Sequence, residues 1–400
     1  MLRLKADGMS EMEKKCVLTL DEMSITPSVE LHLGNREAVW EHNTTWPQRP
    51  GHSCLSVHAG WCYYAVETAA ASIGLHVVNI TTDMGSPNRA MWKSFWVTYA
   101  KPWTAHPVKP HQHLYFMPDV PHVVKNLKSA LVNGHVITIP QDVVDKEKLP
   151  SSVVSVGPLK DLVSYQEGMA LKLAPKLSRG VLEPSHFEKM KVSSAMHVFS
   201  KSSSAALRYM VAEEHRPESY LTTAWFLDHW FDLMSSRNTV TALSHFKMEE
   251  YDKAIIFLRD SIHLFRGLKI GPKGSWKPVQ TGLVMATTTI LEVQHDLLRQ
   301  GHKFVLTSRF TQDCLENTFS SIRLRNSVPT PVEFQSALRA VTVGQFLSPV
   351  HTGSYVEDGS DHLADFLDTQ NSSCSPPDVL RVEQLVDLTT PPDITKTEAL

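Results

Sequence analysis

Three carboxylates lie where regular elements are expected to end, and they come from distant parts of the chain. Asp21 follows the short apolar run 16–20, which is typical of a strand. Asp119 lies between the apolar run 115–117 and a predicted helix, and Glu316 lies on another predicted helix. Acids gathered in this way suit a two-metal phosphodiesterase, because Mg²⁺ prefers oxygen ligands and a pair of ions can stabilise both the attacking and the leaving oxygen.

Another acid and two basic residues flank these carboxylates. Asp313 lies three residues before Glu316, so both face the same side of their helix. His122 and Lys125 lie within two turns of Asp119, where they could contact a phosphate group or remain ordinary surface residues. The chain has 42 acidic residues, and an acid at a strand end is often only a turn or helix-capping residue, so both interpretations of the acids stay open.

Basic and aromatic pairs elsewhere allow two interpretations each. Arg323 and Arg325 end the helix that carries Glu316. They could hold a DNA backbone, because a guanidinium group offers a two-pronged fork for phosphate, or they could complement the negative end of the helix. Trp92 and Trp96 lie four residues apart, a spacing that favours core packing over a platform for stacking bases.

The first third of the chain alternates between strand and helix patterns. Apolar, β-prone runs predict strands over residues 16–20, 28–33, 55–57, 76–80 and 115–117. We expect the second strand to pair with the first as a hairpin. Helices are predicted over residues 61–73 and from Pro121 to Gly134. This order predicts a mixed α/β layer.

The helical period dominates the middle of the chain. Helices are predicted over residues 160–173, 185–199, 202–213, 222–234, 247–268 and 282–298, followed by one over 312–324. A largely helical domain is therefore expected inside the α/β part. Beyond Thr352 the chain carries ten acidic and two basic residues among many Ser, Pro and Thr, which predicts a disordered acidic tail.

Composition excludes several classes of protein. Of 400 residues, 42% are hydrophobic and 20% charged, as in a globular protein. No apolar run approaches the roughly 20 residues that a membrane-spanning helix requires, and the charged first 15 residues do not resemble a secretory signal. The five cysteines include no CxxC pair, which favours free thiols in a reducing compartment over a disulfide framework or a cysteine zinc site.

Several motifs resemble those of the P-element-type DNA transposases, the family that includes the THAP-domain transposases. The sequence LDEMSI at 20–25 is similar to the first catalytic block, and PDVPHVVKNL at 118–127 is similar to the second. The third block is matched by TQDCLENTFSSIR at 311–323, and it is the most specific of the three. Shorter matches are TDMGSPNR at 82–89 and TPVEF at 330–334.

The resemblance implies a fold and a set of metal ligands. The fold would be an RNase H-like mixed sheet interrupted by a mainly α-helical insertion domain. The first catalytic part would cover residues 1–135, the insertion 136–300, the final catalytic helix and its extension 301–351, and the tail 352–400. Asp21, Asp119 and Glu316 would bind two Mg²⁺ or Mn²⁺ ions, with Asp313 as an accessory acid. Asp83 would shape a turn and bind no metal.

The resemblance also implies a nucleotide cofactor. In the family the insertion domain binds GTP, and FLDHWFDLMSSR at 226–237 is similar to the helix concerned, with Asp232 and Ser235 as candidate contacts. Ser235 stands where the family usually has Asn. No Walker-type phosphate loop is present in the sequence, so a plain helical packing domain is the alternative.

The function implied is metal-dependent cleavage and strand transfer at transposon ends. DNA would be the partner, with a homo-oligomer assembled on it in the nucleus and no membrane involved. The family usually begins with a THAP zinc domain, and no set of three cysteines and a histidine precedes Asp21. The stretch that should supply the third strand of the sheet is also short. These departures keep an alternative open, an inactive domesticated or truncated remnant that acts as a nuclear DNA- or protein-binding factor.

Overall fold

The computed structural model describes residues 2–21, 29–31, 38–40, 66, 68–184, 193–324 and 326–347. It separates into two compact units, residues 1–338 and 339–400, and the account below concerns the first. The strands are β1 (Lys15–Leu20), β2 (Val29–Leu31), β3 (Ala38–Trp40), β4 (His76–Thr82), β5 (Trp103–Ala105), β6 (His113–Pro118), β7 (Ile137–Thr138), β8 (Val153–Val154) and β9 (Lys269–Ile270).

The helices are α1 (Leu2–Asp7), α3 (Ser86–Ser94), α4 (Val120–Val132), α5 (Gln141–Glu147), α6 (Gly157–Gln166), α7 (Arg179–Leu182), α8 (Ser193–Val198), α9 (Lys201–Ala212), α10 (Tyr220–Leu227), α11 (Trp230–Met234), α12 (Met248–Gly267), α13 (Pro278–Arg299), α14 (Asp313–Arg323) and α15 (Pro331–Leu347). Two 3₁₀ turns, η2 (His245–Lys247) and η3 (Thr307–Phe310), precede α12 and α14. In the described part of the chain, no helix is both long and apolar enough to cross a membrane. The predicted mixed α/β class is confirmed.

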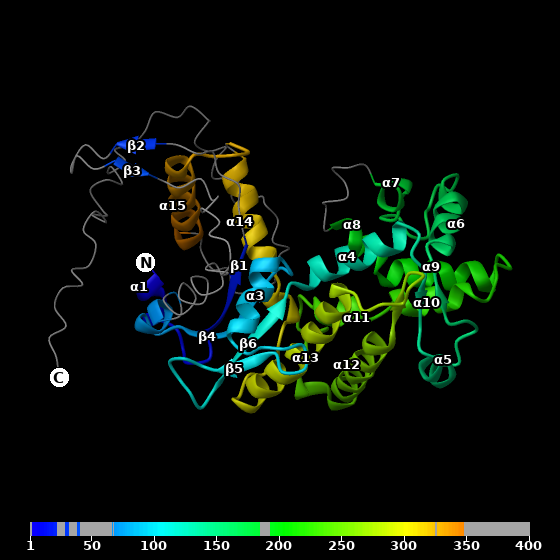
Figure 1. Ribbon diagram of the computed structural model, residues 1–400, viewed down its shortest axis with the longest axis horizontal. Helices are drawn as coiled ribbons and strands as arrows, with labels where there is room; N and C mark the ends of the chain where they lie inside the picture. The colour runs from blue at the N-terminus through cyan, green and yellow to red at the C-terminus, as the bar shows by residue number, and fades with distance from the viewer. Residues whose placement is uncertain are drawn as a thin grey trace. The chain divides into compact units, whose positions relative to one another are not determined.

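A four-stranded sheet with the order β1-β4-β6-β5 organises the first unit (Figure 1). Strands β1, β4 and β6 are parallel, and the edge strand β5 runs antiparallel to β6. Leu20 pairs with Thr82, and Thr82 pairs with Pro118, so the three parallel strands end in register. Each strand is followed at once by an aspartate, which brings Asp21, Asp83 and Asp119 to one edge of the sheet.

The expected hairpin between the first two strands is wrong. Strand β2 pairs antiparallel with β3 in a separate two-stranded sheet, and among the described strands β1 has β4 as its only partner. A three-residue strand carries too short a sequence pattern to specify its partner. The predicted strand at 55–57 and the acidic tail lie outside the described residues, as do residues 61–65 and 67 of the predicted helix 61–73, whereas residues 68–72 are helical as expected.

Helices α4 and α13 connect the sheet to the helical part of the chain. Helix α4 starts directly after β6, with Asp119 as its N-cap and Pro121 in its first turn, and stops before Gly134, whose φ is +82°. Helix α13 packs against β6, where the Thr289 hydroxyl donates to the Phe116 carbonyl at 2.9 Å. A β-carbon at Gly282 would lie 2.8 Å from Val123, so glycine permits the close approach of α13 to α4.

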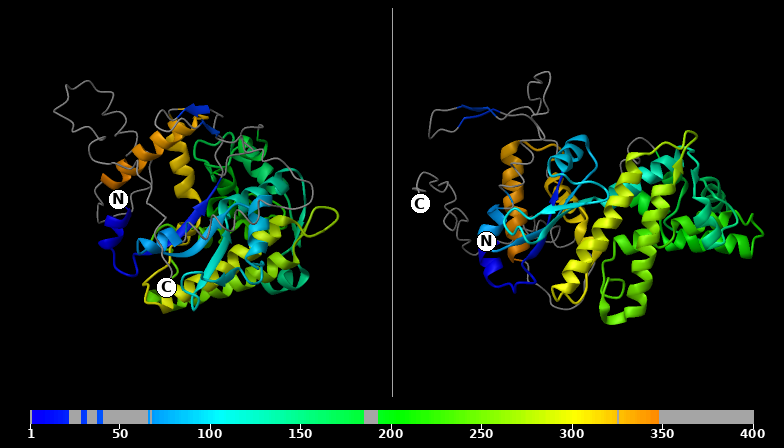
Figure 2. Two further views of the ribbon diagram at one scale, coloured as in Figure 1. Left: turned by 60° about the vertical axis from the view of Figure 1, so that its left-hand side comes forward. Right: turned by 60° about the horizontal axis from the view of Figure 1, so that its bottom comes forward.

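The middle of the chain is mainly helical, but it departs from expectation in several places. Helix α6 ends at Gln166, before the predicted end at residue 173, and α5 and α7 were not predicted. Residues 222–234 form two helices instead of one, because His229 adopts a φ of +65° between α10 and α11. A small sheet with the order β8-β7-β9 also lies within this part, and such two-residue strands leave no periodic signal. Helices α12 and α13 run side by side (Figure 2). One continuous apolar core extends from Tyr115 and Met117 on β6 into these helices.

Candidate functional site

The end of β6 carries a buried carboxylate that is fixed from two directions. Asp119 is 1% exposed, and its Oδ2 accepts hydrogen bonds from the backbone N–H and the ring Nδ1 of His122, at 3.0 and 2.8 Å. Its Oδ1 accepts the backbone N–H of Gln312 at 2.8 Å, across 193 residues of sequence. Asp119 therefore has two roles: it caps the N-terminus of α4, and it joins the end of β6 to the segment that precedes α14.

Gln312 joins the ends of β1 and β6. Its backbone holds Asp119, and its side-chain amide donates to the carbonyl of Leu20, the residue before Asp21. Beside this contact the hydroxyl of Thr19 lies 3.8 Å from the Sγ of Cys314 on α14. The start of α14 is therefore locked onto the same sheet edge where the strand-end aspartates gather.

Glu316 lies in the first turn of α14, on the side of His122. Burial lowers the pKa of His122, but the hydrogen bond and charge of Asp119 outweigh it, and the charge of Glu316 acts in the same direction, so the net pKa is raised. A protonated His122 is therefore favoured between the two acids. Lys125 lies one turn further along α4 and opposes this effect.

The remaining predicted site residues take different positions. Asp83 accepts hydrogen bonds from the Gly85 N–H at 2.8 Å and the Asn88 amide at 2.6 Å, as expected of a residue that shapes a turn. Asp313 forms an ion pair of 2.6 Å with Arg237 of the helical part. Arg323 lies over the ring of Phe319, 5.7 Å from its centroid, while Arg325 lies outside the described residues.

The described part of the chain holds no group of three His, Cys, Asp or Glu side chains positioned to share a metal ion. The structure brings Asp21, Asp119 and Glu316 to one region without joining them into a coordination shell, and their role as ligands stays a prediction. The carboxylate oxygens of these three residues are the kind of ligand that a hard cation such as Mg²⁺ prefers. A carboxylate has about four lone-pair positions, and three hydrogen bonds to Asp119 leave one open, or two if the His122 ring turns away.

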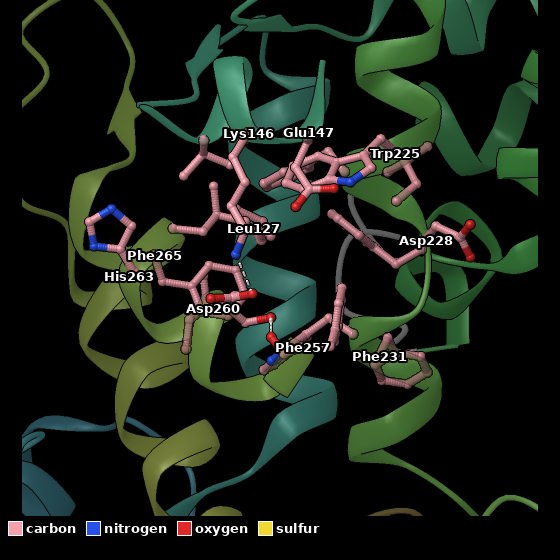
Figure 3. A pocket seen from close by; sticks show the side chains of 18 of the residues that line it. Leu127, Lys146, Glu147, Trp225, Asp228, Phe231, Phe257, Asp260, His263 and Phe265 are labelled. Carbon is pink, nitrogen blue, oxygen red and sulfur yellow. Dashed lines mark hydrogen bonds and ion pairs between the residues drawn. The ribbon is translucent and has the colours of Figure 1, made fainter. Parts of the chain in front are cut away.

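A pocket of about 140 Å³ lies in the helical part (Figure 3). The rings of Trp225, Phe231 and Phe257 border it, and the Lys146–Asp260 ion pair of 2.6 Å crosses it. The predicted nucleotide contacts lie outside its lining. Asp232 lies 3.9 Å from Lys201, and its pKa is raised by burial, while the Ser235 hydroxyl donates to the Phe231 carbonyl at 2.7 Å.

Comparison with known proteins agrees with this architecture. Residues 122–248 match the model of the TNP-like, GTP-binding insertion domain. The transposable element P transposase of Drosophila melanogaster is 22% identical over 364 residues, which cover 85% of this chain and 47% of that protein. The solved Drosophila P element transposase strand transfer complex superposes with a TM-score of 0.69 at 20% identity, covering 87% of this chain and 81% of that one.

The family model, the relative and the solved structure together support the P-element-type transposase family for this chain. The chain spans about half the length of the curated relative that it matches. The structural likeness shows a shared fold, and the family model matches from within α4 to the first residue of α12. The sequence suggested the three acids, whose role stays a prediction, but it gave no role to Gln312, whose contacts are with residues that are distant along the chain.

Proposed function

We propose that this chain is a DNA transposase that cleaves DNA and transfers strands through Asp21, Asp119 and Glu316. The observation that supports this most is the register of the three parallel strands, together with Gln312, which contacts the ends of β1 and β6 directly before α14. The fold would be RNase H-like and interrupted by a helical insertion. DNA at transposon ends would be the substrate, bound by a homo-oligomer in the nucleus.

The chain's own groups would divide the work by position. Asp21, Asp119 and Glu316 would hold two Mg²⁺ or Mn²⁺ ions, which supply Lewis acidity at the phosphate. Gln312 keeps the Asp119 carboxylate oriented through its N–H, and His122 balances the charge of that buried acid. Lys125 and Arg323 would contact the DNA backbone, where positive charge stabilises phosphate without reading sequence. His122 would join them once it leaves Asp119.

Calorimetric titration with Mn²⁺ tests the proposal. We expect the wild-type chain to bind the ion and Asp119→Ala to lose binding, because a buried ligand is removed. Asp260→Asn is the matched control, since Asp260 forms an ion pair with Lys146 in the helical part, away from the strand ends. A plasmid-nicking assay in Mn²⁺ should follow the same order. Equal binding by wild type and Asp119→Ala would contradict the proposed ligand set.

One observation favours a second function, a catalytically silent DNA- or protein-binding factor. The described side chains form no assembled metal cluster, and β1, which carries Asp21, has a partner on one side only among the described strands. A strand that pairs on one side has fewer backbone hydrogen bonds to fix the position of the acid that follows it. Under this alternative the titration would show no Mn²⁺ binding by the wild type, while the chain would still bind DNA.

We also propose that the insertion-type region binds GTP beside α11. The family model supports this, and Asp232 offers a half-buried carboxylate that could accept hydrogen bonds from guanine. Ser235 offers a hydroxyl oxygen as a further acceptor on the same side. Titration with GTP and ATP, compared between wild type, Asp232→Asn and the control Asp252→Asn, should show selective binding of GTP that is weakened only in Asp232→Asn.

A further inference from the structure

The turn after α3 exposes a tryptophan in a strained conformation. Trp96 is 86% exposed and has a φ of +58°. Its N–H donates to the Lys93 carbonyl and the Val97 N–H donates to the Trp92 carbonyl, so α3 ends in a Schellman motif with Trp96 at the position that glycine normally occupies. Both the strain and the exposure of a large apolar ring are unfavourable in the isolated chain, which points to a role in contact with a partner.

A second exposed aromatic residue follows Trp96 by three positions, and it contacts a third from a distant segment. Tyr99, at the next turn, is 41% exposed and lies 5.8 Å from the ring of Trp276, which is itself 46% exposed. Trp276 comes from the connection between β9 and α13, more than 170 residues away in sequence, where its indole N–H donates to Thr281. Two loops therefore bring exposed aromatic rings to one surface.

The two segments that carry these rings are basic. Residues 84–118, which run from just before α3 to the end of β6, and residues 269–278, which join β9 to α13, contain seven lysines and arginines and no aspartate or glutamate. Lys93, Lys101 and Lys273 are exposed. Among the acids of α13, Glu292 accepts a hydrogen bond from Trp103 and Asp296 accepts one from the Tyr115 hydroxyl. We call the surface formed by Lys93, Trp96, Tyr99, Lys101, Lys273 and Trp276 the aromatic-basic surface.

We propose that the aromatic-basic surface binds DNA with unstacked bases, as in a single-stranded stretch next to a cleaved end. Lysines that flank exposed aromatic rings match a phosphate backbone and free base faces, whereas a closed duplex offers its base faces only at its ends. The choice of DNA as the partner rests on the proposed function. The surface itself does not depend on the metal site.

Fluorescence anisotropy with a labelled 20-nucleotide oligonucleotide, in EDTA, tests the proposal on the full chain. We expect Trp96→Ala and Tyr99→Ala each to weaken binding of the single strand by about fivefold or more, because stacking on one aromatic ring contributes that much. Replacing Lys93 and Lys101 with alanine should weaken the salt dependence of binding. The slope of log K against the logarithm of the salt concentration should become less negative by about 0.7 for each phosphate group that is no longer neutralised. Phe246→Ala is the control, since Phe246 is 75% exposed and lies outside this surface.

Trp96→Gly gives a readout that a structural role would not produce. Glycine relieves the left-handed conformation, so the variant should unfold about 2 °C higher while it binds the oligonucleotide more weakly. Equal binding by Trp96→Ala and Phe246→Ala, or no binding by wild type, would overturn the proposal. A change of oligomeric state in Trp96→Ala, with DNA binding intact, would overturn it in favour of a protein contact. Because no metal is present, a failure of the proposed cleavage leaves this result unaffected.

Discussion

Replacing Gln312 with alanine should separate the stability of the fold from the arrangement of the acids. The substitution keeps the backbone N–H that holds Asp119 and removes the side-chain amide that holds the Leu20 carbonyl. The Oε1 atom of Gln312 is buried and has no hydrogen-bond partner, so it already destabilises the native state. The side chain therefore makes one favourable contact and carries one unfavourable group.

The expected magnitude follows from these two terms. Loss of the hydrogen bond and the unpaired Leu20 carbonyl should cost about 1–3 kcal/mol, and removal of the unpaired Oε1 should return a similar amount. Gln280, equally buried, provides the comparison. Its amide donates to the Phe265 and Leu268 carbonyls and its oxygen accepts the Lys277 N–H, so both ends are satisfied. Gln280→Ala removes no unpaired group, so it should lower the free energy of unfolding by about 3 kcal/mol more than Gln312→Ala does.

Urea unfolding and Mn²⁺ titration of both variants give the answer. Gln312→Ala should keep most of its free energy of unfolding yet bind Mn²⁺ about tenfold more weakly, because groups that orient metal ligands typically contribute that much. Gln280→Ala should lose stability and bind the ion normally. Equal losses of stability would refute the argument from the unpaired oxygen, and unchanged Mn²⁺ affinity in Gln312→Ala would refute its positioning role.

Three other predictions follow from buried groups. Thr307→Val should lower the free energy of unfolding by about 2 kcal/mol, measured by urea unfolding, because the hydroxyl of Thr307 both accepts and donates hydrogen bonds to the end of α11. Burial raises the pKa of Cys16 to about 11, so peptide mapping after iodoacetamide treatment at neutral pH should show Cys16 unmodified while the exposed Cys314 reacts. Burial, together with a nearby lysine, lowers the pKa of His76 and His302, so the stability they contribute is present above the unfolded value of about 6.5 and is lost as the pH falls through their folded values. Urea midpoints should accordingly fall from pH 6.5 to pH 5, by about half as much in His302→Gln, and an unchanged slope in that variant would contradict the assignment.

The elements that carry the acids could be predicted because their signals are local. Strand β1 is a short β-prone run closed by an acid, and α4 begins with an N-cap aspartate and a proline and ends at a glycine. The strand pairings could not be predicted in the same way. Strands β7, β8 and β9 have two residues each, and their residues are joined only through contacts over long sequence separations.

The interpretation of Trp96 was wrong for a reason that is physical. A spacing of four residues places two side chains on one helix face only while the helix continues, and α3 ends at Ser94. Trp92 is buried as expected, whereas Trp96 lies beyond the helix end in a left-handed conformation and points to solvent. The role of Gln312 could not be predicted for a related reason, because its contact with Leu20 spans 292 residues and leaves no local sequence pattern.

The helical part and the acids are joined by a short connection of buried hydrogen bonds, which has consequences for how they move. Ser236, just after α11, exchanges hydrogen bonds of 2.8 to 3.2 Å with Thr307 and Ser308 of η3, and Arg237 pairs with Asp313 at the start of α14. Only two residues separate η3 from Asp313, and one of them is Gln312. A displacement of α11 therefore breaks several buried hydrogen bonds or moves Gln312, and with it the carboxylate of Asp119. Since close packing makes the first option costly, the position of α11 and the orientation of Asp119 are linked through this connection.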